Sequence, residues 1–521
     1  KRGRPLTIVA SRLRQREARR VARIPACRQR GPLVSSAISA TAALALVAAL
    51  CPSGGCRGTP MTFAPADIES HAMLPGVAPG FMLGVATSAY QIEGGNQNDW
   101  TDWEGGQYPE GKPHVAGGAS AARAADSWNL WRQDVAAVEA LGANVYRLGV
   151  EWSRLEPSEG TWDRAAAARY REMFAALRAA QPRAIAPMVN LYHFTLPRWV
   201  AARGGWEWAG APAAFAAFAG RAGEAFGDLV DLWCTLNEPN VYVAKGYLAA
   251  QWPPGVRDPA RAARVLARLL EAHGLATAAL RANDRTDADG DLHATRIGLA
   301  HNVRVFDPAG GPIAGLLDGL VAKVADDFYN RTVPEAVANG RIHIVLPMSV
   351  TIDEPAPGLR GTFDWFGVNY YTRDMVSSRL LRAAFGRGTP YEVVNDPARP
   401  RSDMGWEIYP EGLYRLLVGF ASYGWPIVVS ESGIADRGGE VRPSFIRSHV
   451  YAIDRARAEG VPVIGYLHWS LIDNFEWSHG FEGRFGLYTI DFAGDPALTR
   501  RPTPAVKTFQ DLARRLGNLG D

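Results

Sequence analysis

Two glutamates occupy sequence contexts that could bring a pair of carboxylates into one site. Glu238 lies in the run TLNEP at residues 235–239, and Glu431 lies in IVVSESG at residues 427–433. Each follows a short apolar run typical of a buried strand and precedes a turn signal. Two carboxylates at strand ends suit the cleavage of a glycosidic bond, in which one protonates the leaving oxygen and the other attacks carbon or activates water. This pairing predicts a glycoside-cleaving site.

The elements that would position these glutamates alternate along the chain from Met61 onward. Eight short apolar runs alternate with Ala-rich stretches that have a helical pattern, which predicts a parallel sheet covered by helices. Eight such units favour an α/β fold with a single (β/α)8 TIM barrel. Residues 351–357 and 383–400 are expected to be long loops. The apolar runs end near Thr87, Glu151, His193, Glu238, Asn302, Tyr371, Glu431 and Trp469.

A barrel makes a local prediction, because catalytic groups of this fold lie at the carboxyl ends of the strands. Polar and aromatic residues fall at or beside six of the expected strand ends. They are Arg147, His193, Glu238, Tyr371, Glu431 and Trp469.

Three motifs in this order resemble those of the family 1 glycoside hydrolases, the β-glucosidase and β-galactosidase group. They are SAYQIEG at residues 88–94, TLNEP at 235–239, and WSLIDNFEW at 469–477 followed by RFGL at 484–487. The resemblance extends from about residue 81 to residue 509. It implies the (β/α)8 barrel and cleavage with retention of the anomeric configuration.

The resemblance assigns roles to five residues of the reaction centre. Glu238 would be the acid/base, which requires a raised pKa, and Glu431 would be the nucleophile, which requires groups that favour its anion. Arg147 and Tyr371 would hold the Glu431 carboxylate, and we expect them to depress its pKa. Asn237 would bind the sugar 2-hydroxyl.

A second set of residues resembles the sugar-binding residues of the family. Gln91 and Glu476 would accept hydrogen bonds from hydroxyls of the sugar, Trp469 would lie against the ring, and the Trp477 indole would donate. His193 belongs to this set because of the motif around it. A carboxylate at Glu476 would repel a phosphate on carbon 6, so an unphosphorylated sugar is expected.

The chain departs from the family pattern at three motifs. Ser432 follows Glu431 where asparagine is usual, and residues 193–195 read HFT where HWD is usual. The arginine motif, RLGVEW at 147–152, is also loose. None of these changes removes a reacting group, so they bear on subsite shape and turnover.

Residues 1–60 differ in composition from the body. The first 30 residues hold eleven Lys or Arg and one acid, and an uncharged apolar run follows at residues 33–50. A secretory signal, a membrane anchor and an over-extended reading upstream of Met61 all fit this pattern. The protein is expected to be cytoplasmic if Met61 is the start, and periplasmic or secreted if the leader is a signal. The domains are therefore predicted as a leader at 1–60 and a glycosidase domain at 61–521.

The sequence gives little support for a nucleic-acid-binding, metal-binding or nucleotide-binding site. The whole chain carries +3, so the body without its basic leader is acidic, which argues against a nucleic-acid-binding domain. The body has a single cysteine, Cys234, and lacks a zinc motif and a P-loop. Residues 287–290 resemble part of a calcium loop, but Arg285 and Arg296 occupy its first and last ligand positions, which favours a solvated turn. No cofactor or metal is expected.

The sequence thus predicts a retaining, exo-acting β-glucosidase that hydrolyses small-molecule β-glycosides, with β-galactosides or β-fucosides as further substrates. A transglycosidase acting through the same residues and a non-catalytic sugar-binding relative are the alternatives. No membrane association is expected for the catalytic domain. The aglycone, the preference between glucose and galactose, and the oligomeric state stay open.

Overall fold

A computed structural model describes residues 62–520, apart from 78–79, 311–313, 348 and 379–391. The predicted leader at 1–60 lies outside the described residues, and so do residues 383–391 of one expected loop. Among the residues that the structure describes, no helix combines the length and the apolar character needed to cross a bilayer.

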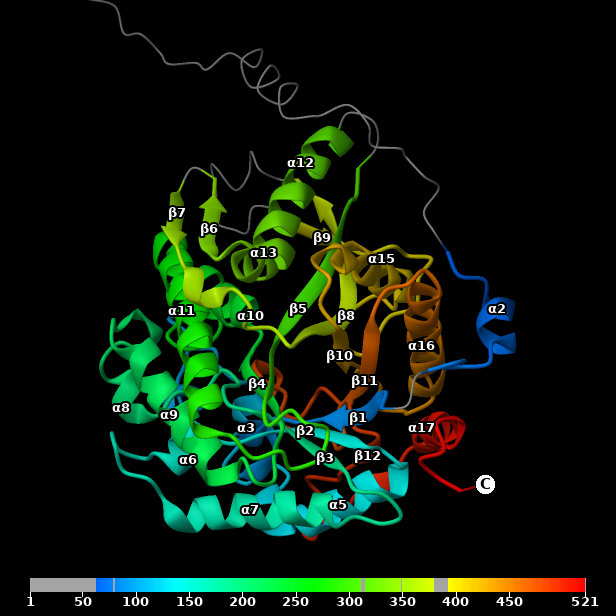
Figure 1. The fold of residues 1–521 in the computed structure, drawn as a ribbon. Helices are drawn as coiled ribbons and strands as arrows, with labels where there is room; N and C mark the ends of the chain where they lie inside the picture. The colour runs from blue at the N-terminus through cyan, green and yellow to red at the C-terminus, as the bar shows by residue number, and fades with distance from the viewer. Residues whose placement is uncertain (1–61, 78–79, 311–313, 348, 379–391, 521) are drawn as a thin grey trace, which may run out of the picture. The chain divides into compact units, whose positions relative to one another are not determined.

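Eight parallel strands close into a barrel (Figure 1). Their order around the sheet is β10–β11–β1–β2–β3–β4–β5–β8, and a pairing of β8 with β10 closes it. The predicted (β/α)8 barrel is confirmed. The strands are β1 (Met82–Ala86), β2 (Val145–Gly149), β3 (Ala186–Asn190), β4 (Leu232–Asn237), β5 (Arg296–Pro308), β8 (Trp365–Ser377), β10 (Ile427–Ser432) and β11 (Val463–Trp469).

Each barrel strand is followed in the chain by at least one helix of the outer layer (Figure 1). Two of these helices, α7 (Arg164–Arg178) and α11 (Pro259–Asn283), begin at a capping carboxylate. Asp163, for example, accepts hydrogen bonds from the backbone N–H groups of Ala165 and Ala166, both at 2.9 Å. The helices are α5 (Ser127–Leu141), α7 (Arg164–Arg178), α9 (Ala211–Phe226), α11 (Pro259–Asn283), α12 (Ala314–Asp326), α13 (Thr332–Asn339), α15 (Pro410–Phe420), α16 (Arg442–Ala458) and α17 (Pro504–Arg515).

The interior of the barrel is filled by apolar side chains from all eight strands. Because successive residues of a strand point to opposite faces, alternate residues fill the barrel and the others pack against the helices. This filling closes the barrel as a packed core and leaves polar side chains to gather at the carboxyl ends of the strands. The inner cluster comprises Met82, Val145, Met188, Leu232, Cys234, Ala300, Trp365, Val428 and Leu467.

The connection between β5 and β8 differs from the sequence prediction. Residues 351–357 were expected to form a loop, but most of them belong to β7 (Val350–Pro355), which pairs antiparallel with β6 (Arg341–Leu346). Ile352 alternates with exposed neighbours and is buried, so one apolar side chain suffices to hold this short strand. The prediction for 351–357 is wrong for this reason.

Candidate active site

The predicted reaction centre forms at the carboxyl ends of β2, β4 and β10 and at the middle of the long strand β8. Glu431 lies in β10, and Glu238 directly follows β4 with a left-handed backbone (φ 47°). The side chains of both glutamates are buried, as is that of Arg147 in β2. Gly433 is required next to Glu431, because a Cβ there would lie 1.8 Å from the Trp469 carbonyl oxygen.

The Glu431 carboxylate is held by two donors. Arg147 Nη1 contacts its Oε1 atom, and the Tyr371 hydroxyl donates to its Oε2 atom at 2.6 Å. A buried guanidinium and a buried hydroxyl that both donate to the carboxylate favour its ionised form. The contacts expected for Arg147 and Tyr371 are therefore present.

The expectation of a depressed pKa for Glu431 is wrong. Burial is the largest effect and raises the pKa of Glu431 above its ordinary value, while Arg147 and the Tyr371 hydroxyl act in the opposite direction. Burial removes water from the anion, a cost that sequence patterns do not report.

The Glu238 carboxylate is held by neutral amides. Its Oε1 atom accepts from Asn302 Nδ2 at 2.8 Å and from Asn369 Nδ2 at 2.9 Å. Burial, followed by the charge of Glu431, raises the pKa of Glu238 to about 7. The raised pKa expected for this residue is thus present, and the group can hold a proton near neutral pH.

Asn237 links the two halves of the centre. Its Oδ1 atom accepts from Arg147 Nη2 at 2.6 Å and from Asn369 Nδ2 at 3.1 Å. With the oxygen fixed by these donors, the Asn237 amide nitrogen faces His193 Nε2 at 3.1 Å. Burial and then the charge of Arg147 hold the pKa of His193 well below its ordinary value, so the imidazole is neutral.

The expected sugar-binding residues gather beside this centre. Gln91 is fixed by Ser88, whose hydroxyl donates to Oε1 at 2.7 Å, and its Nε2 lies 3.3 Å from Glu476 Oε2. Burial, followed by the charges of Glu431 and Glu238, raises the pKa of Glu476 to about 8. The three carboxyl groups thus lie close enough for their charges to interact, and Glu431 is the one of them in contact with a guanidinium.

The aromatic residues of this set form a stack around His193. The imidazole is stacked with Trp469 at a centroid distance of 5.9 Å and with Trp477, also at 5.9 Å. Both indoles are almost completely buried, so the ring faces near His193 are held rigidly. A fixed aromatic wall of this kind suits the apolar face of a sugar ring.

Two of the departures from the family pattern, Phe194 and Thr195, contact neither of the two glutamates in the contacts described here. The Thr195 hydroxyl donates to Glu151 at 3.0 Å, and Phe194 packs against Trp252 and Trp477 with centroids at 4.9 and 5.1 Å. These residues therefore support the wall of the pocket and leave the reacting groups unchanged.

Sequence reasoning missed the two asparagines that hold Glu238. Asn302 and Asn369 lie within β5 and β8, and Asn302 is itself oriented by the Tyr329 hydroxyl, which donates to its Oδ1 at 2.7 Å. The available signal was a polar residue near a predicted strand end, the same signal that selected Tyr371. This signal could have identified both asparagines as candidate site residues, but it could not show that they contact Glu238.

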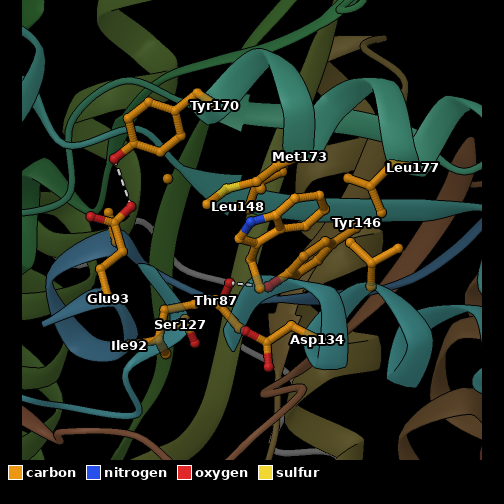
Figure 2. Close-up of a pocket in the computed structure, with 14 residues that line it drawn as sticks. Thr87, Ile92, Glu93, Ser127, Asp134, Tyr146, Leu148, Tyr170, Met173 and Leu177 are labelled. Carbon is orange, nitrogen blue, oxygen red and sulfur yellow. Dashed lines mark hydrogen bonds between the residues drawn. The ribbon is translucent and has the colours of Figure 1, made fainter. Parts of the chain in front are cut away.

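A separate small cavity lies between α3 (Ala89–Glu93) and β2 on one side and α5 and α7 on the other (Figure 2). Its volume is about 30 Å³, which is room for about one water molecule. The two acids that line it are paired, since the Tyr170 hydroxyl donates to Glu93 at 2.6 Å and Arg500 contacts Asp134 at 2.8 Å. The cavity is a packing feature of the outer layer, too small for a sugar.

Three aspartates lie close together at the other end of the barrel, near the calcium-like segment. One carboxylate oxygen from each of Asp231, Asp287 and Asp289 lies within 4.8 Å of the others. Arg178 pairs with Asp231 at 2.8 Å and Arg296 with Asp289 at 2.9 Å. Arginine charges therefore already neutralise two of these acids.

Comparisons with known proteins agree with this geometry. The model of glycosyl hydrolase family 1 matches residues 75–518. A β-galactosidase from Pyrococcus woesei is 32% identical over 510 residues, covering 84% of this chain and 97% of that protein. The structure of a β-glycosidase from Pyrococcus horikoshii has a TM-score of 0.72 and 33% identity, covering 84% of this chain and 95% of that one. A β-glucosidase from Thermotoga maritima in complex with glucoimidazole has a TM-score of 0.73 and 27% identity, covering 85% and 99%.

Proposed function

This chain belongs to glycosyl hydrolase family 1, and we propose that Glu431 and Glu238 perform its reaction as nucleophile and acid/base. The protein is a retaining β-glycosidase. The observation that carries the assignment is the contrast between the two carboxylates. Glu431 is held by Arg147 and Tyr371, which favour an anion, whereas Glu238 is held by neutral amides and has a pKa near 7.

In the first step, a Glu431 oxygen attacks the anomeric carbon while Glu238 transfers its proton to the glycosidic oxygen. The bond from carbon to that oxygen breaks, the aglycone leaves as a neutral alcohol, and a covalent glycosyl-enzyme forms on Glu431. Such a double displacement requires carboxyl groups about 5 Å apart, and a separation near roughly 9 Å would indicate inversion instead.

The second step requires Glu238 to act as a base. Formation of the ester removes the negative charge of Glu431, which is the second-largest cause of the raised pKa of Glu238. The pKa of Glu238 therefore falls in the intermediate, and the carboxylate can accept a proton from the attacking water. Water then displaces Glu431 and releases the sugar with its original anomeric configuration.

The substrate is proposed to be an unphosphorylated β-glucoside, with β-galactosides and β-fucosides as further substrates. Glu476 and Gln91 lie side by side where sugar hydroxyls would bind, and a phosphate at that position would meet the carboxyl group of Glu476 instead of a cation. Rates on matched nitrophenyl β-glucoside, β-galactoside and β-fucoside test the preference. Proton NMR of the first product tests the reaction, since it predicts the β-anomer, and the α-anomer would exclude retention.

The same assays, repeated with an added alcohol, separate hydrolysis from transglycosylation and from binding without catalysis. A transglycosidase would transfer the sugar to an added alcohol in preference to water, so the alkyl glycoside would dominate the products. A non-catalytic relative would bind a sugar without releasing nitrophenol. We expect free sugar to be the main product at low alcohol concentration.

The pH dependence should report the acid/base. Because Glu238 must be protonated in the first step and its pKa is about 7, kcat/KM should fall as the pH rises through about 7. Asn302 donates to the ionised form and lowers this pKa, so Asn302→Ala should move the alkaline limb to higher pH. A limb that stays in place or moves to lower pH would show that another group titrates. The pH profile of kcat/KM on one aryl glucoside provides the measurement.

Loss of the Tyr371 hydroxyl should slow the reaction without unfolding the protein. Tyr371→Phe removes a hydrogen bond of 2.6 Å to Glu431, and we expect kcat to fall by about 10- to 100-fold. Tyr370→Phe is a matched control, because the Tyr370 hydroxyl donates to the Tyr409 carbonyl on the outer face of the barrel. An equal effect of both substitutions on kcat would argue against the role of Tyr371.

A further inference from the structure

A lysine follows the acid/base closely in the chain and lies near the wall of the sugar-binding site. Lys245 belongs to η3 (Ala244–Leu248), the turn that continues α10 (Pro239–Val243) directly after Glu238. Its backbone carbonyl accepts from Trp252 N at 3.3 Å, and Trp252 packs against Trp477 with centroids 5.5 Å apart. Lys245 therefore lies beside the sugar-binding wall, further out along the chain from the acid/base.

The charges around Lys245 leave this part of the site positive. The Lys245 ammonium donates to a neutral group, Gln251 Oε1, at 2.9 Å. Asp374 is a nearby acid, but Arg304 already pairs with it at 3.1 Å. His479 also lies near Lys245, and the charges of Lys112 and Glu482 act on His479 as well. Within the described residues, no carboxylate forms a salt bridge with the Lys245 ammonium.

The pocket for the sugar has the opposite character. The carboxyl groups of Glu238, Glu431 and Glu476 lie there, and the Glu431 anion would repel an acidic group on the sugar. An anionic substituent can be accommodated only outward of the scissile bond, where Lys245 and Arg304 lie. The polarity of the site therefore changes from acidic to basic along the substrate.

An indole forms part of the wall on this outer side. Trp406 is partly exposed and packs edge-on against Tyr371, the residue that donates to Glu431, at a centroid distance of 5.7 Å. The Arg304 guanidinium lies 5.9 Å from the centre of the Trp406 ring. An aromatic group leaving from the anomeric carbon can stack on this surface.

We propose that the aglycone site accepts an aromatic acid, with its ring against Trp406 and its carboxylate paired with Lys245. This inference rests on the proposed function and adds the chemical class of the aglycone. An aromatic ring with a carboxylate satisfies both features at once, whereas an alkyl chain or a neutral sugar would leave the ammonium without an anion.

The test compares two substrates that differ in one charge, the β-glucoside of 4-hydroxybenzoate and that of its methyl ester. The readout is the ratio of kcat/KM for the acid to kcat/KM for the ester, because differences in leaving-group chemistry cancel between variants. We expect Lys245→Met to lower this ratio by about fivefold, mainly through KM, and Lys245→Arg to restore it. Lys507→Met, which removes an exposed charge on α17, is the matched control and should leave the ratio unchanged.

The pH provides a second readout of the same pair. Burial and then Arg304 lower the pKa of Lys245 to about 8, so its charge and the preference for the acid should be lost as the pH rises from 7 to 9. The other charged groups near Lys245 are Arg304 and Asp374, and Lys112 and Glu482 lie near His479. Burial lowers the pKa of His479, so this imidazole stays neutral over the range. The Lys245→Met variant should show no such change.

The outcomes separate the two proposals. Hydrolysis of both glucosides with the same ratio in native protein and Lys245→Met would overturn the aromatic-acid inference alone. Hydrolysis of neither glucoside by the native protein would overturn it together with the proposed function. Lys245→Gln gives the same comparison should methionine at this position prevent folding.

Discussion

Replacing Glu431 by glycine is expected to reduce kcat on an aryl β-glucoside by roughly 10⁴-fold or more, because the covalent step loses its nucleophile. The side chain is buried and held by Arg147 and Tyr371, and glycine leaves space where the carboxylate stood. A small anion can occupy this space. Added azide should therefore restore turnover, and because it attacks from the face that Glu431 occupied, the product should be the α-glucosyl azide.

The control for this variant is a substitution in the same pocket. Glu476→Gln removes a neighbouring carboxylate and should weaken sugar binding, yet it should give no glucosyl azide, since the nucleophile is still present. Thermal unfolding of each variant shows whether the fold is retained. Formation of α-glucosyl azide by the Glu476 variant, or its absence with Glu431→Gly, would count against the assigned nucleophile.

Replacing Glu238 by alanine is expected to have an effect that depends on the leaving group. Phenols that leave readily need little protonation, so the first step on a dinitrophenyl glucoside should change least, whereas kcat/KM on an unactivated glycoside should fall by about 10²- to 10⁴-fold. The alkaline limb near pH 7 should also disappear, because Glu238 carries that proton.

The product formed with azide distinguishes Glu238→Ala from Glu431→Gly. Azide needs no general base, so it should attack the glycosyl-enzyme of Glu238→Ala and release the β-glucosyl azide. Glu151→Gln is a useful comparison, since Glu151 is also buried but receives its hydrogen bonds from Ser153 and Thr195 behind the pocket. A drop in kcat/KM for Glu238→Ala that is the same for activated and unactivated substrates would rule out its role as the acid.

The barrel could be predicted because its strands are short apolar runs that each end at a recognisable polar residue. The prediction failed between β5 and β8, where both strands continue for 13 residues. Here the strands extend past Asn302 and Tyr371 by pairing with each other, and the polar residues lie inside the strands. A rule that ends a strand at its active-site residue cannot anticipate this extension.

The residues of the reaction centre could be predicted where a sequence motif marks them. Glu238, Glu431, Arg147 and Tyr371 lie together as expected, but the amides around Glu238 come from strands that meet only when the barrel closes. The pKa of Glu431 was mispredicted for a similar reason. The sequence names its cationic partner, whereas the burial that outweighs this partner depends on the packing around it.

The most direct test of the central claim is the mass of the intact protein after incubation with 2-deoxy-2-fluoro-β-glucosyl fluoride. The fluorine at carbon 2 slows both steps, whereas the fluoride leaving group at carbon 1 speeds the first, so a covalent glycosyl-enzyme should accumulate. We predict a single adduct that peptide mapping places on Glu431, and its loss in Glu431→Gly. An adduct on Glu238 or Glu476 would contradict the assignment of Glu431 as the nucleophile. Release of 2-deoxy-2-fluoroglucose with no adduct on any residue would contradict it as well.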